Sequence, residues 1–402
     1  MKQATDRGSA GGALDRAMSL IDLLANEIGP RRPTERGERL AAQLMRDELA
    51  RNGVDAEIEP FEGYASFGTP YGLIQAAAVL PSLLPTRRRR LRSSLALLSG
   101  ALLVGESSLK FPAASRLLAR KQSTNVVATI EPADGARAER TLCLMCHLDT
   151  SRSGLMFHPR AARLLGYWIA LQGVAGIAQA IGEPLLGGSR AGRRSLGAVR
   201  SVLAAGLLLL LERELRGEDV PGANDNASGC AVASVLAGEV AAQPLASTRL
   251  MLLMSGCEES GTLGAQAFLA GHDTDGWLFL NFDNVGGPGP VKFLRKEGVL
   301  AKWDADPALI ATAQRVADAD ADLRLEPEDA PAGLTWDTSP VLAAGGRALT
   351  LSVQDGFIPD LHWPTDTYDN VVPDGVDRTL RAGRSMIAAV DAGSADSPQP
   401  AG

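Results

Sequence analysis

Short apolar runs alternate with segments of helical periodicity along most of this 402-residue chain. The runs have the length and the aliphatic or β-branched composition of buried strands, and the segments between them place apolar residues three and four positions apart. This alternation is typical of a mainly parallel sheet with helices on both faces. The sequence therefore predicts a three-layer α/β/α fold with a mainly parallel, mixed sheet.

The expected elements follow one another closely. Helical spacing covers residues 14–28, 35–52, 227–242, 262–270, 307–317 and 375–392. Strand-like runs lie at 55–60, 125–130, 142–147, 248–255, 277–282 and 348–353. Because 43 glycines and only 4% aromatic residues accompany a hydrophobic content of 45%, we expect a core of small and aliphatic side chains joined by tight turns.

Two stretches, 64–121 and 151–220, interrupt this pattern, and each contains two apolar segments joined by a basic loop. The apolar segments lie at 71–85, 95–105, 164–182 and 202–211. The basic loops contain Arg87–Arg90, Arg92, Arg190, Arg193 and Arg194. We therefore expect two inserted apolar helical hairpins.

These insertions need a cover, because exposed as they stand they would form a larger apolar patch than a soluble monomer tolerates. We expect membrane contact through 71–105 and 164–211, since hairpins rich in Leu, Ala and Gly can pack closely in a bilayer. Only 164–182 approaches the roughly 20 residues that span a bilayer. A homodimer interface and a lid over the active site therefore stay open as alternatives.

The two ends of the chain, 1–12 and 393–402, are small, polar and rich in Gly or Pro, which predicts loose tails around one domain over 13–392. No cleavable signal peptide is predicted, because the N-terminal residues contain no apolar core. We expect membrane association, with a cytoplasmic location as the alternative. The side of the membrane is unresolved: the arginine loops favour cytoplasmic hairpin tips, whereas an unprocessed polar N-terminus favours an internal domain.

Charge and cysteine content exclude further classes. The net charge of −7 is spread along the chain without long basic blocks, so a nucleic-acid partner has little support. The cysteines lack the paired spacing of a disulfide framework, and all fall in apolar stretches, which predicts reduced core residues. They are Cys143, Cys146, Cys230 and Cys257.

Acidic and histidine side chains follow the ends of the expected strands, where sites form in parallel sheets. They are His147, Asp149, Glu258, Glu259, Asp283 and His362, joined by Asp225 at the start of a helix. Neighbouring side chains in extended backbone point opposite ways, so one of the two glutamates can bind a metal while the other moves protons. Each motif alone has an ordinary structural explanation, such as a helix cap at Asp225 or a turn at Asp283. Only the ordered combination is specific.

Imidazole nitrogen and carboxylate oxygen are ligands that zinc takes in proteins. Two zinc ions roughly 3.5–4 Å apart can share one carboxylate. Asp225, held in a turn between Gly222 and Gly229, is the shareable carboxylate of this chain. One histidine and one further acid then remain for each metal, so we expect two Zn²⁺ ions per chain.

Five motifs follow one another along the chain: His-x-Asp at 147–149, Gly-Ala-Asn-Asp-Asn-Ala-Ser-Gly at 222–229, Glu-Glu-x-Gly at 258–261, Asn-x-Asp at 281–283 and the late His362. In this order they resemble the motifs of the zinc exopeptidases of the aminopeptidase Y and bacterial leucyl aminopeptidase type. That family includes glutamate carboxypeptidases and is related to glutaminyl cyclases. The resemblance covers 13–63, 122–150 and 221–392 and leaves both insertions outside it. It implies a single exopeptidase catalytic domain over 13–392.

Carried over residue by residue, the resemblance implies that His147 and Asp283 hold one zinc, that Glu259 and His362 hold the other, and that Asp225 bridges them. It implies Glu258 as the general base toward a metal-activated water that attacks a peptide or aminoacyl substrate.

Three further expectations accompany this resemblance. Asp149 is suited to accept the second N–H of His147 and fix its tautomer. A cis peptide at Asp225–Asn226 is implied by the family. The chain departs from the family at Trp336-Asp337-Thr338, which lacks the histidine that commonly follows the acid, and this leaves the residues that polarise the substrate carbonyl open. Trp336 and Trp363 are pocket-wall candidates.

An aminopeptidase is the leading hypothesis, with amino- versus carboxypeptidase polarity and side-chain preference left open. One alternative is a single-zinc acyltransferase of the glutaminyl cyclase kind, using Asp225, Glu259 and His362 and leaving His147 and Asp283 without metal. A non-catalytic, receptor-like scaffold is another alternative, whose signature would be missing ligands.

Overall fold

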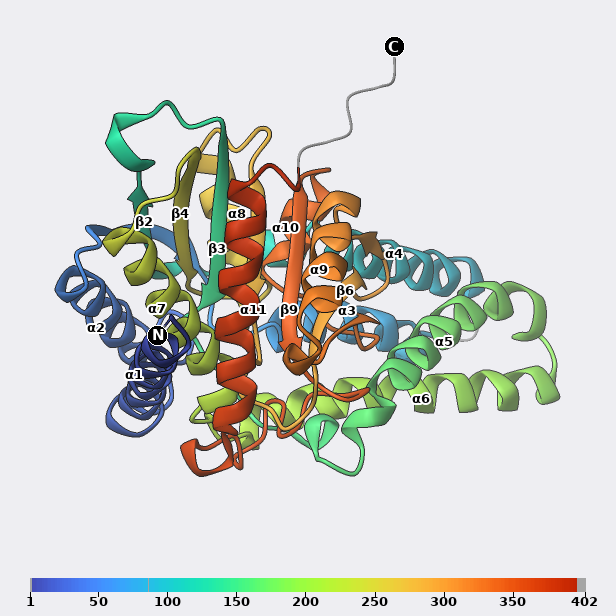
Figure 1. The fold of residues 1–402 in the computed structure, drawn as a ribbon. Helices are drawn as coiled ribbons and strands as arrows, with labels where there is room; N and C mark the ends of the chain where they lie inside the picture. The colour runs from blue at the N-terminus through green and yellow to red at the C-terminus, as the bar shows by residue number, and fades with distance from the viewer. Residues whose placement is uncertain (1, 86, 396–402) are drawn as a thin grey trace, which may run out of the picture.

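In the computed structural model, residues 2–85 and 87–395 are described, with side chains from Gly12 onward except that of residue 134. Figure 1 shows a twisted sheet with helices on both faces and a helical lobe that extends to one side of it.

The described residues contain one sheet of nine strands, in the order β1-β2-β4-β3-β5-β9-β6-β7, with β8 paired to β6. The strands are β1 (Ala56–Gly63), β2 (Lys121–Ile130), β3 (Arg140–His147), β4 (Thr248–Ser255), β5 (Leu278–Phe282), β6 (Val291–Glu297), β7 (Trp303–Asp304), β8 (Leu325–Asp329) and β9 (Arg347–Val353). The central strands β4, β3, β5 and β9 are parallel, and antiparallel pairs flank them. The predicted mixed sheet with a parallel centre is confirmed.

Residues alternate between the two faces of the sheet, as the pleat requires. On β3, Leu142 and Leu144 face the larger core, whereas Cys143 and Met145 face the smaller one. The larger core is covered by α1 (Lys2–Asp22), α2 (Arg36–Arg51), α7 (Gly229–Ala242), α9 (Pro307–Ala319) and α11 (Pro373–Asp391). The smaller core is covered by α8 (Leu263–Gly271) and α10 (Thr338–Ala343). The three layers are therefore confirmed, and the four cysteines are free and buried as predicted.

The sequence prediction missed the strands at one end of the sheet and misjudged one tail. β8 reads Leu-Glu-Pro-Glu-Asp and β6 carries three basic residues, so neither shows a clean apolar pattern; edge regions of sheets commonly carry such charges and prolines. The loose tail predicted for 1–12 is wrong from residue 2, because α1 begins at Lys2. Residues 2–12 contain no proline, and helical hydrogen bonds join residues close in sequence, so the helix can continue toward the N-terminus. The other predicted tail is described only to Ala395, which is fully buried; residues 396–402 lie outside the described residues.

The two insertions form helical hairpins, as predicted. They contain α3 (Gly68–Val79) with α4 (Arg89–Ser107), and α5 (Leu165–Leu186) with α6 (Arg190–Arg216). α3 packs on α4 and α6, and α5 packs on α4 and α6. These helices, called the four-helix lobe below, extend away from the sheet on one side (Figure 1).

Candidate metal centre

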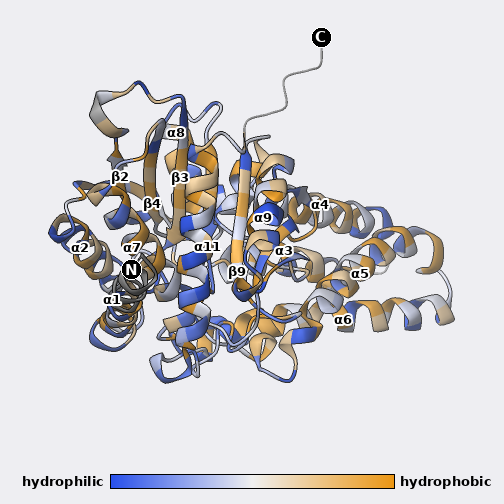
Figure 2. Cartoon of the chain, in the orientation of Figure 1, coloured by the Kyte–Doolittle hydropathy of each residue, from blue (hydrophilic) through white to orange (hydrophobic). Residues whose placement is uncertain are grey.

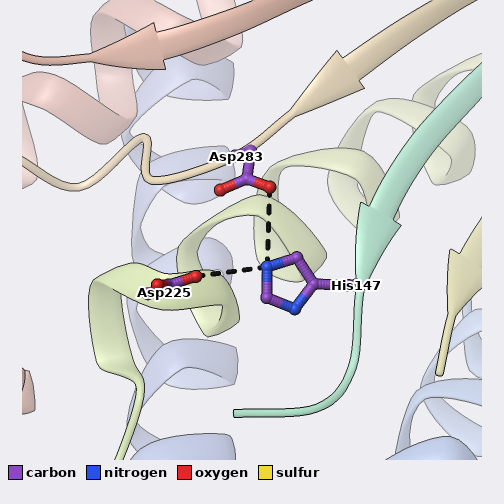
Figure 3. A group of neighbouring side chains, drawn as sticks. All are labelled: His147, Asp225 and Asp283. Carbon is purple, nitrogen blue, oxygen red and sulfur yellow. Dashed lines mark ion pairs between the residues drawn. The ribbon is translucent and has the colours of Figure 1, made fainter. Parts of the chain in front are cut away.

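The first group of candidate ligands comes from the ends of two neighbouring strands and one turn. His147 is the last residue of β3, Asp283 directly follows β5, and Asp225 lies in the segment Ala223–Ser228 before α7. The Nε2 atom of His147 is 3.1 Å from Oδ1 of Asp225 and 3.5 Å from Oδ2 of Asp283 (Figure 3). All three side chains are buried. Their ligand atoms therefore surround one small space.

The second group uses the other oxygen of the same aspartate. His362 lies in the loop after β9, and Glu259 follows β4. The Nε2 atom of His362 is 3.4 Å from Oδ2 of Asp225 and 3.1 Å from Oε2 of Glu259. The structure thus brings all five predicted ligands together, with Asp225 common to both groups.

The donor set fits zinc. Within each group the ligand atoms lie within 4.8 Å of one another, and they are the imidazole nitrogens and carboxylate oxygens that zinc takes. Oε1 of Glu259 is buried without a hydrogen-bond partner among the described residues. Buried carboxylate oxygens are normally satisfied, so a cation at this position would supply the missing partner.

Without metal, the close packing of buried acids and histidines shifts their pKa values. Burial opposes ionisation of Asp225, but hydrogen bonds from His147 and His362 outweigh it and hold the pKa of Asp225 below its ordinary value. Burial also disfavours the imidazolium of His362, yet the neighbouring Glu259 and Asp225 raise its pKa to about 9. Burial raises the pKa of Asp283. Two imidazoles thus act as the counter-charges that a metal would replace.

Glu258 belongs to neither ligand group. It is half-buried and lines the pocket beside the metal ligands. Burial raises its pKa well above the ordinary value, and the charges of Glu259 and the nearby aspartates act in the same direction. Glu258 is therefore an acid with a raised pKa that faces the pocket without belonging to either ligand group.

Asp149 positions these glutamates through their backbone. Its carboxylate accepts the main-chain N–H of Glu258 at 3.0 Å and of Glu259 at 2.9 Å. The expected carboxylate partner of His147 is corrected in one detail: Oδ1 of Asp149 is 3.7 Å from Nδ1 of His147, whereas the main-chain carbonyl oxygen of Asp149 is 3.1 Å away. The main-chain carbonyl oxygen is therefore the nearer acceptor for this imidazole nitrogen.

Two buried residues near the ligands were not predicted from the sequence. The guanidinium of Arg31 donates to main-chain carbonyl oxygens on both sides of the first ligand group, at Leu148 and Gly222. The carboxylate of Asp366 accepts the main-chain N–H of Asn224 at 2.6 Å and of Asp225 at 3.0 Å. Neither residue stands in a motif, because both act on backbone atoms of segments far away in sequence.

The backbone around the ligands is unusual. His362, Asn284 and Cys257 have positive φ angles of 51°, 56° and 55°, which non-glycine residues adopt at a cost. Each is a ligand or lies within two residues of one. The peptide bond Asp225–Asn226 is cis, as the resemblance implied.

A pocket of about 220 Å³ contains the metal centre and continues into the four-helix lobe. Phe157, from the second insertion, packs on the imidazole of His362 with ring centroids 4.3 Å apart. Trp336 lines the pocket, as proposed from the sequence. Trp363 is not among the described lining residues; it packs on His158 instead. The insertions therefore wall the pocket above the ligands.

The segment Trp336-Asp337-Thr338, in which the chain departs from the family pattern, contains an acid that does not line the pocket. Asp337 is fully buried, its Oδ2 accepts the hydroxyl of Ser255 at 2.5 Å, and burial raises its pKa to about 7. Asp337 is therefore a structural acid behind β4 and does not line the pocket.

Comparisons with known proteins agree with this geometry. The chain is similar in structure to BSAP, a zinc aminopeptidase from Bacillus subtilis, with a TM-score of 0.57 and 13% identity over 94% of each chain. It is similar to an aminopeptidase from Aneurinibacillus sp. strain AM-1, with a TM-score of 0.56 and 16% identity over 94% of this chain and 93% of that one. It is also similar to the Fimbriiglobus ruber glutaminyl cyclase, with a TM-score of 0.55 and 14% identity over 93% of this chain and 94% of that one.

At these identities the likeness shows the fold. A search of curated proteins gave no match. The model of Peptidase family M28 matches residues 209–387, the range that holds four of the five ligands: Asp225, Glu259, Asp283 and His362. The Peptidase family M28 match thus covers residues 209–387, and the chain has the fold of the zinc aminopeptidases to which it is similar.

Proposed function

We propose that this chain is a zinc-dependent aminopeptidase that holds two zinc ions. The observation that carries this proposal is the position of Asp225, whose two oxygens face two separate histidine–carboxylate pairs. His147 and Asp283 would complete one site, and Glu259 and His362 the other. When bound, the metal pair would polarise the scissile carbonyl and make water a stronger acid and nucleophile.

Glu258 is the general base in this proposal. Its carboxylate lines the pocket beside both ligand groups without belonging to either. It can therefore take a proton from the attacking water and return it to the departing amine, which is the work of one carboxylate with a raised pKa. Asp149 keeps Glu258 in place through the backbone.

The charge of the pocket supports removal of N-terminal rather than C-terminal residues. Among the described residues that line it, acidic side chains are present and neither Lys nor Arg occurs. A free substrate carboxylate would find no Lys or Arg side chain in this lining, whereas a substrate ammonium group would find carboxylates. The two aminopeptidase neighbours favour the same polarity.

A glutaminyl cyclase is the second candidate, because such enzymes are also structural neighbours. A single-zinc enzyme of that kind would need only Asp225, Glu259 and His362. In this chain the His147 and Asp283 pair is intact and faces the same aspartate, which favours the two-metal hydrolase. The complete ligand set also speaks against a non-catalytic scaffold.

The proposal is tested with Glu258→Gln, which keeps the size of the side chain and removes the base. We expect hydrolysis of aminoacyl amides to fall by about 10²–10⁴-fold while the zinc content stays that of the wild type. Glu259→Ala serves as the contrast, since it should lose metal as well as activity. Unchanged turnover in Glu258→Gln would refute the assignment, and cyclisation of N-terminal glutamine without hydrolysis would establish the second candidate.

A further inference from the structure

The four-helix lobe exposes large apolar side chains on each of its helices. Leu73 on α3, Leu97 on α4, Ile177 on α5 and Leu208 on α6 are exposed by 48%, 60%, 63% and 63%. Figure 2 shows the lobe coloured largely as hydrophobic. Outside the two insertions, 64–121 and 151–220, the exposed large apolar residues in the described part of the chain are Leu23, Leu40 and Leu300, at 36–39%. The apolar surface is thus confined to the two insertions.

Several polar side chains of the lobe are buried between its helices. Nε2 of Gln75 donates to Oε1 of Gln172 at 2.7 Å, joining α3 to α5. Glu183 of α5 is 1% exposed and pairs with Arg92 of α4 at 3.1 Å and with Arg200 of α6 at 2.6 Å. Buried polar pairs inside a bundle with an apolar exterior are the arrangement that hydrocarbon solvent requires. In water the same arrangement would leave the apolar side uncovered.

The dimensions of the lobe match a bilayer. α5 has 22 residues and α6 has 27, so they are about 33 Å and about 40 Å long at 1.5 Å per residue. The hydrocarbon core of a bilayer is about 30 Å thick. By length and composition both helices could cross it, and only 22% and 17% of their apolar windows are buried. A core helix of a soluble protein would be mostly buried, and these are not.

Basic residues gather where the two hairpins turn. Arg87–Arg90 precede and begin α4, and Arg190, Arg193 and Arg194 begin α6; all of these are exposed. The two turns lie together, since a Cβ atom on Gly188 in the α5–α6 loop would be 2.9 Å from Nη1 of Arg89. The α5–α6 loop forms the end of the lobe farthest from the sheet (Figure 1). Cationic side chains there complement the phosphate groups of anionic lipids.

The metal pocket reaches into this lobe. Each of its helices contributes an inward side chain to the lining: Tyr71 from α3, Leu103 from α4, Ile169 from α5 and Leu210 from α6. A molecule bound at the metal ligands can therefore extend an apolar part between the helices.

We propose that the four-helix lobe inserts into a lipid bilayer and that the metal pocket takes amphiphilic substrates from it, with the scissile amide at the metal ligands and a hydrocarbon or other large apolar group within the lobe. The substrate part of this inference rests on the proposed peptidase activity.

The membrane part is tested by flotation of the full-length chain with vesicles of phosphatidylcholine and a minor share of phosphatidylglycerol. We expect the wild type to float with the vesicles and to need detergent in their absence. Val174→Glu with Ile177→Glu, two outward positions on α5, should lower the floating fraction several-fold. The matched control, Leu23→Glu with Leu40→Glu on the surface outside the lobe, should float like the wild type. A monodisperse chain in detergent-free buffer that stays at the bottom of the gradient, as monomer or dimer, would overturn the inference.

The substrate part is tested with two compounds that share one scissile bond, leucyl-glycine dodecylamide and leucyl-glycine methylamide, by measuring released leucine in detergent. Since each buried methylene adds favourable transfer energy, we expect kcat/KM to be about tenfold or more higher for the dodecylamide. Leu210→Trp, which fills the lobe end of the pocket, should lower the ratio of kcat/KM for the dodecylamide to that for the methylamide. Leu210→Ala leaves the space open, so it should not lower this ratio.

The outcomes separate the two proposals. Equal kcat/KM for both compounds, with leucine released from each, would overturn the amphiphilic substrate and leave the peptidase standing. Release from neither compound in the zinc-loaded chain would instead refute the proposed function.

Discussion

Arg31 is expected to fix the backbone that carries the first group of candidate ligands, although it contacts no ligand side chain. Its guanidinium is 1% exposed and donates five hydrogen bonds to carbonyl oxygens, of Leu24, Gly29, Leu148, Pro221 and Gly222. Leu148 follows His147 directly, and Gly222 opens the turn that carries Asp225. Arg31 thus ties two ligand-bearing segments to the loop after the N-terminal helix.

The substitution Arg31→Lys keeps the charge and removes the fork-shaped set of donors. A lysine ammonium has three N–H donors, so at least two of the five hydrogen bonds are lost. A hydrogen bond to a charged group contributes about 1.5–3 kcal/mol, which predicts a loss of about 3–6 kcal/mol in the free energy of unfolding. Because the segments carrying His147 and Asp225 loosen together, we expect zinc affinity to fall about 10–100-fold, as for other partners of metal ligands.

The assay combines denaturant unfolding of the zinc-loaded chain with competition against a chelator of known zinc affinity. Arg39→Lys is the matched control, because Arg39 is exposed and its Nη1 donates to a single carbonyl oxygen, that of Thr34. It should change neither quantity beyond about 0.5 kcal/mol. If Arg31→Lys behaves like the control in both measurements, the positioning role of Arg31 is wrong.

Three further predictions follow from buried acids and from the metals. Asp366→Asn leaves one acceptor oxygen for the N–H groups of Asn224 and Asp225. The free energy of unfolding should therefore fall by about 1–3 kcal/mol, and the zinc affinity should weaken. Calorimetry and chelator competition that match the wild type would contradict this. Burial raises the pKa of Glu297 from 4.5 to about 7, so the folded state retains a proton that the unfolded state has lost, and the stability present below pH 4.5 is lost as pH rises through 7. At 1.36 kcal/mol per pKa unit this amounts to about 3 kcal/mol, and Glu297→Gln should gain about that much relative to the wild type between pH 4.5 and pH 8 in parallel unfolding titrations; a constant difference across that range would exclude the effect. Removal of zinc with a chelator should abolish hydrolysis of aminoacyl amides, and zinc but not magnesium should restore it, because the donors include imidazole; activity that survives complete zinc removal would contradict the metal requirement.

The centre of the sheet could be predicted from the sequence because its central strands are continuous apolar runs. The strand 248–255 was placed to the residue, and the ends of β3, β4 and β5 place their acids and histidines at one edge of the sheet. β6 and β8 were missed because charged residues and a proline interrupt the apolar pattern that a buried strand shows. The extension of α1 to Lys2 was missed because a Gly-rich, polar composition predicts a loose tail.

The five candidate ligands could be grouped from the sequence, whereas the residues that contact their backbone could not. His147, Asp225, Glu259, Asp283 and His362 stand in ordered motifs, and the structure places them together. Arg31 and Asp366 act on main-chain atoms, and no pattern in a single sequence records such a contact. The acceptor of the second imidazole nitrogen was assigned to the wrong atom of Asp149 for the same reason.

The hairpins were predicted from their apolar runs, but their contribution to the pocket was one of several open alternatives. The structure places Phe157 against His362 and aligns four helices along the cavity that begins at the ligands. Such long-range packing depends on three-dimensional contacts between segments that the sequence keeps apart.

The most direct test of the account is the zinc content of the purified full-length chain by elemental analysis, compared with that of Asp283→Ala. The shared position of Asp225 predicts two zinc ions per wild-type chain and one in the variant, since Glu259, His362 and Asp225 remain. A wild-type chain that binds a single zinc, unchanged by Asp283→Ala, would contradict the two-metal centre.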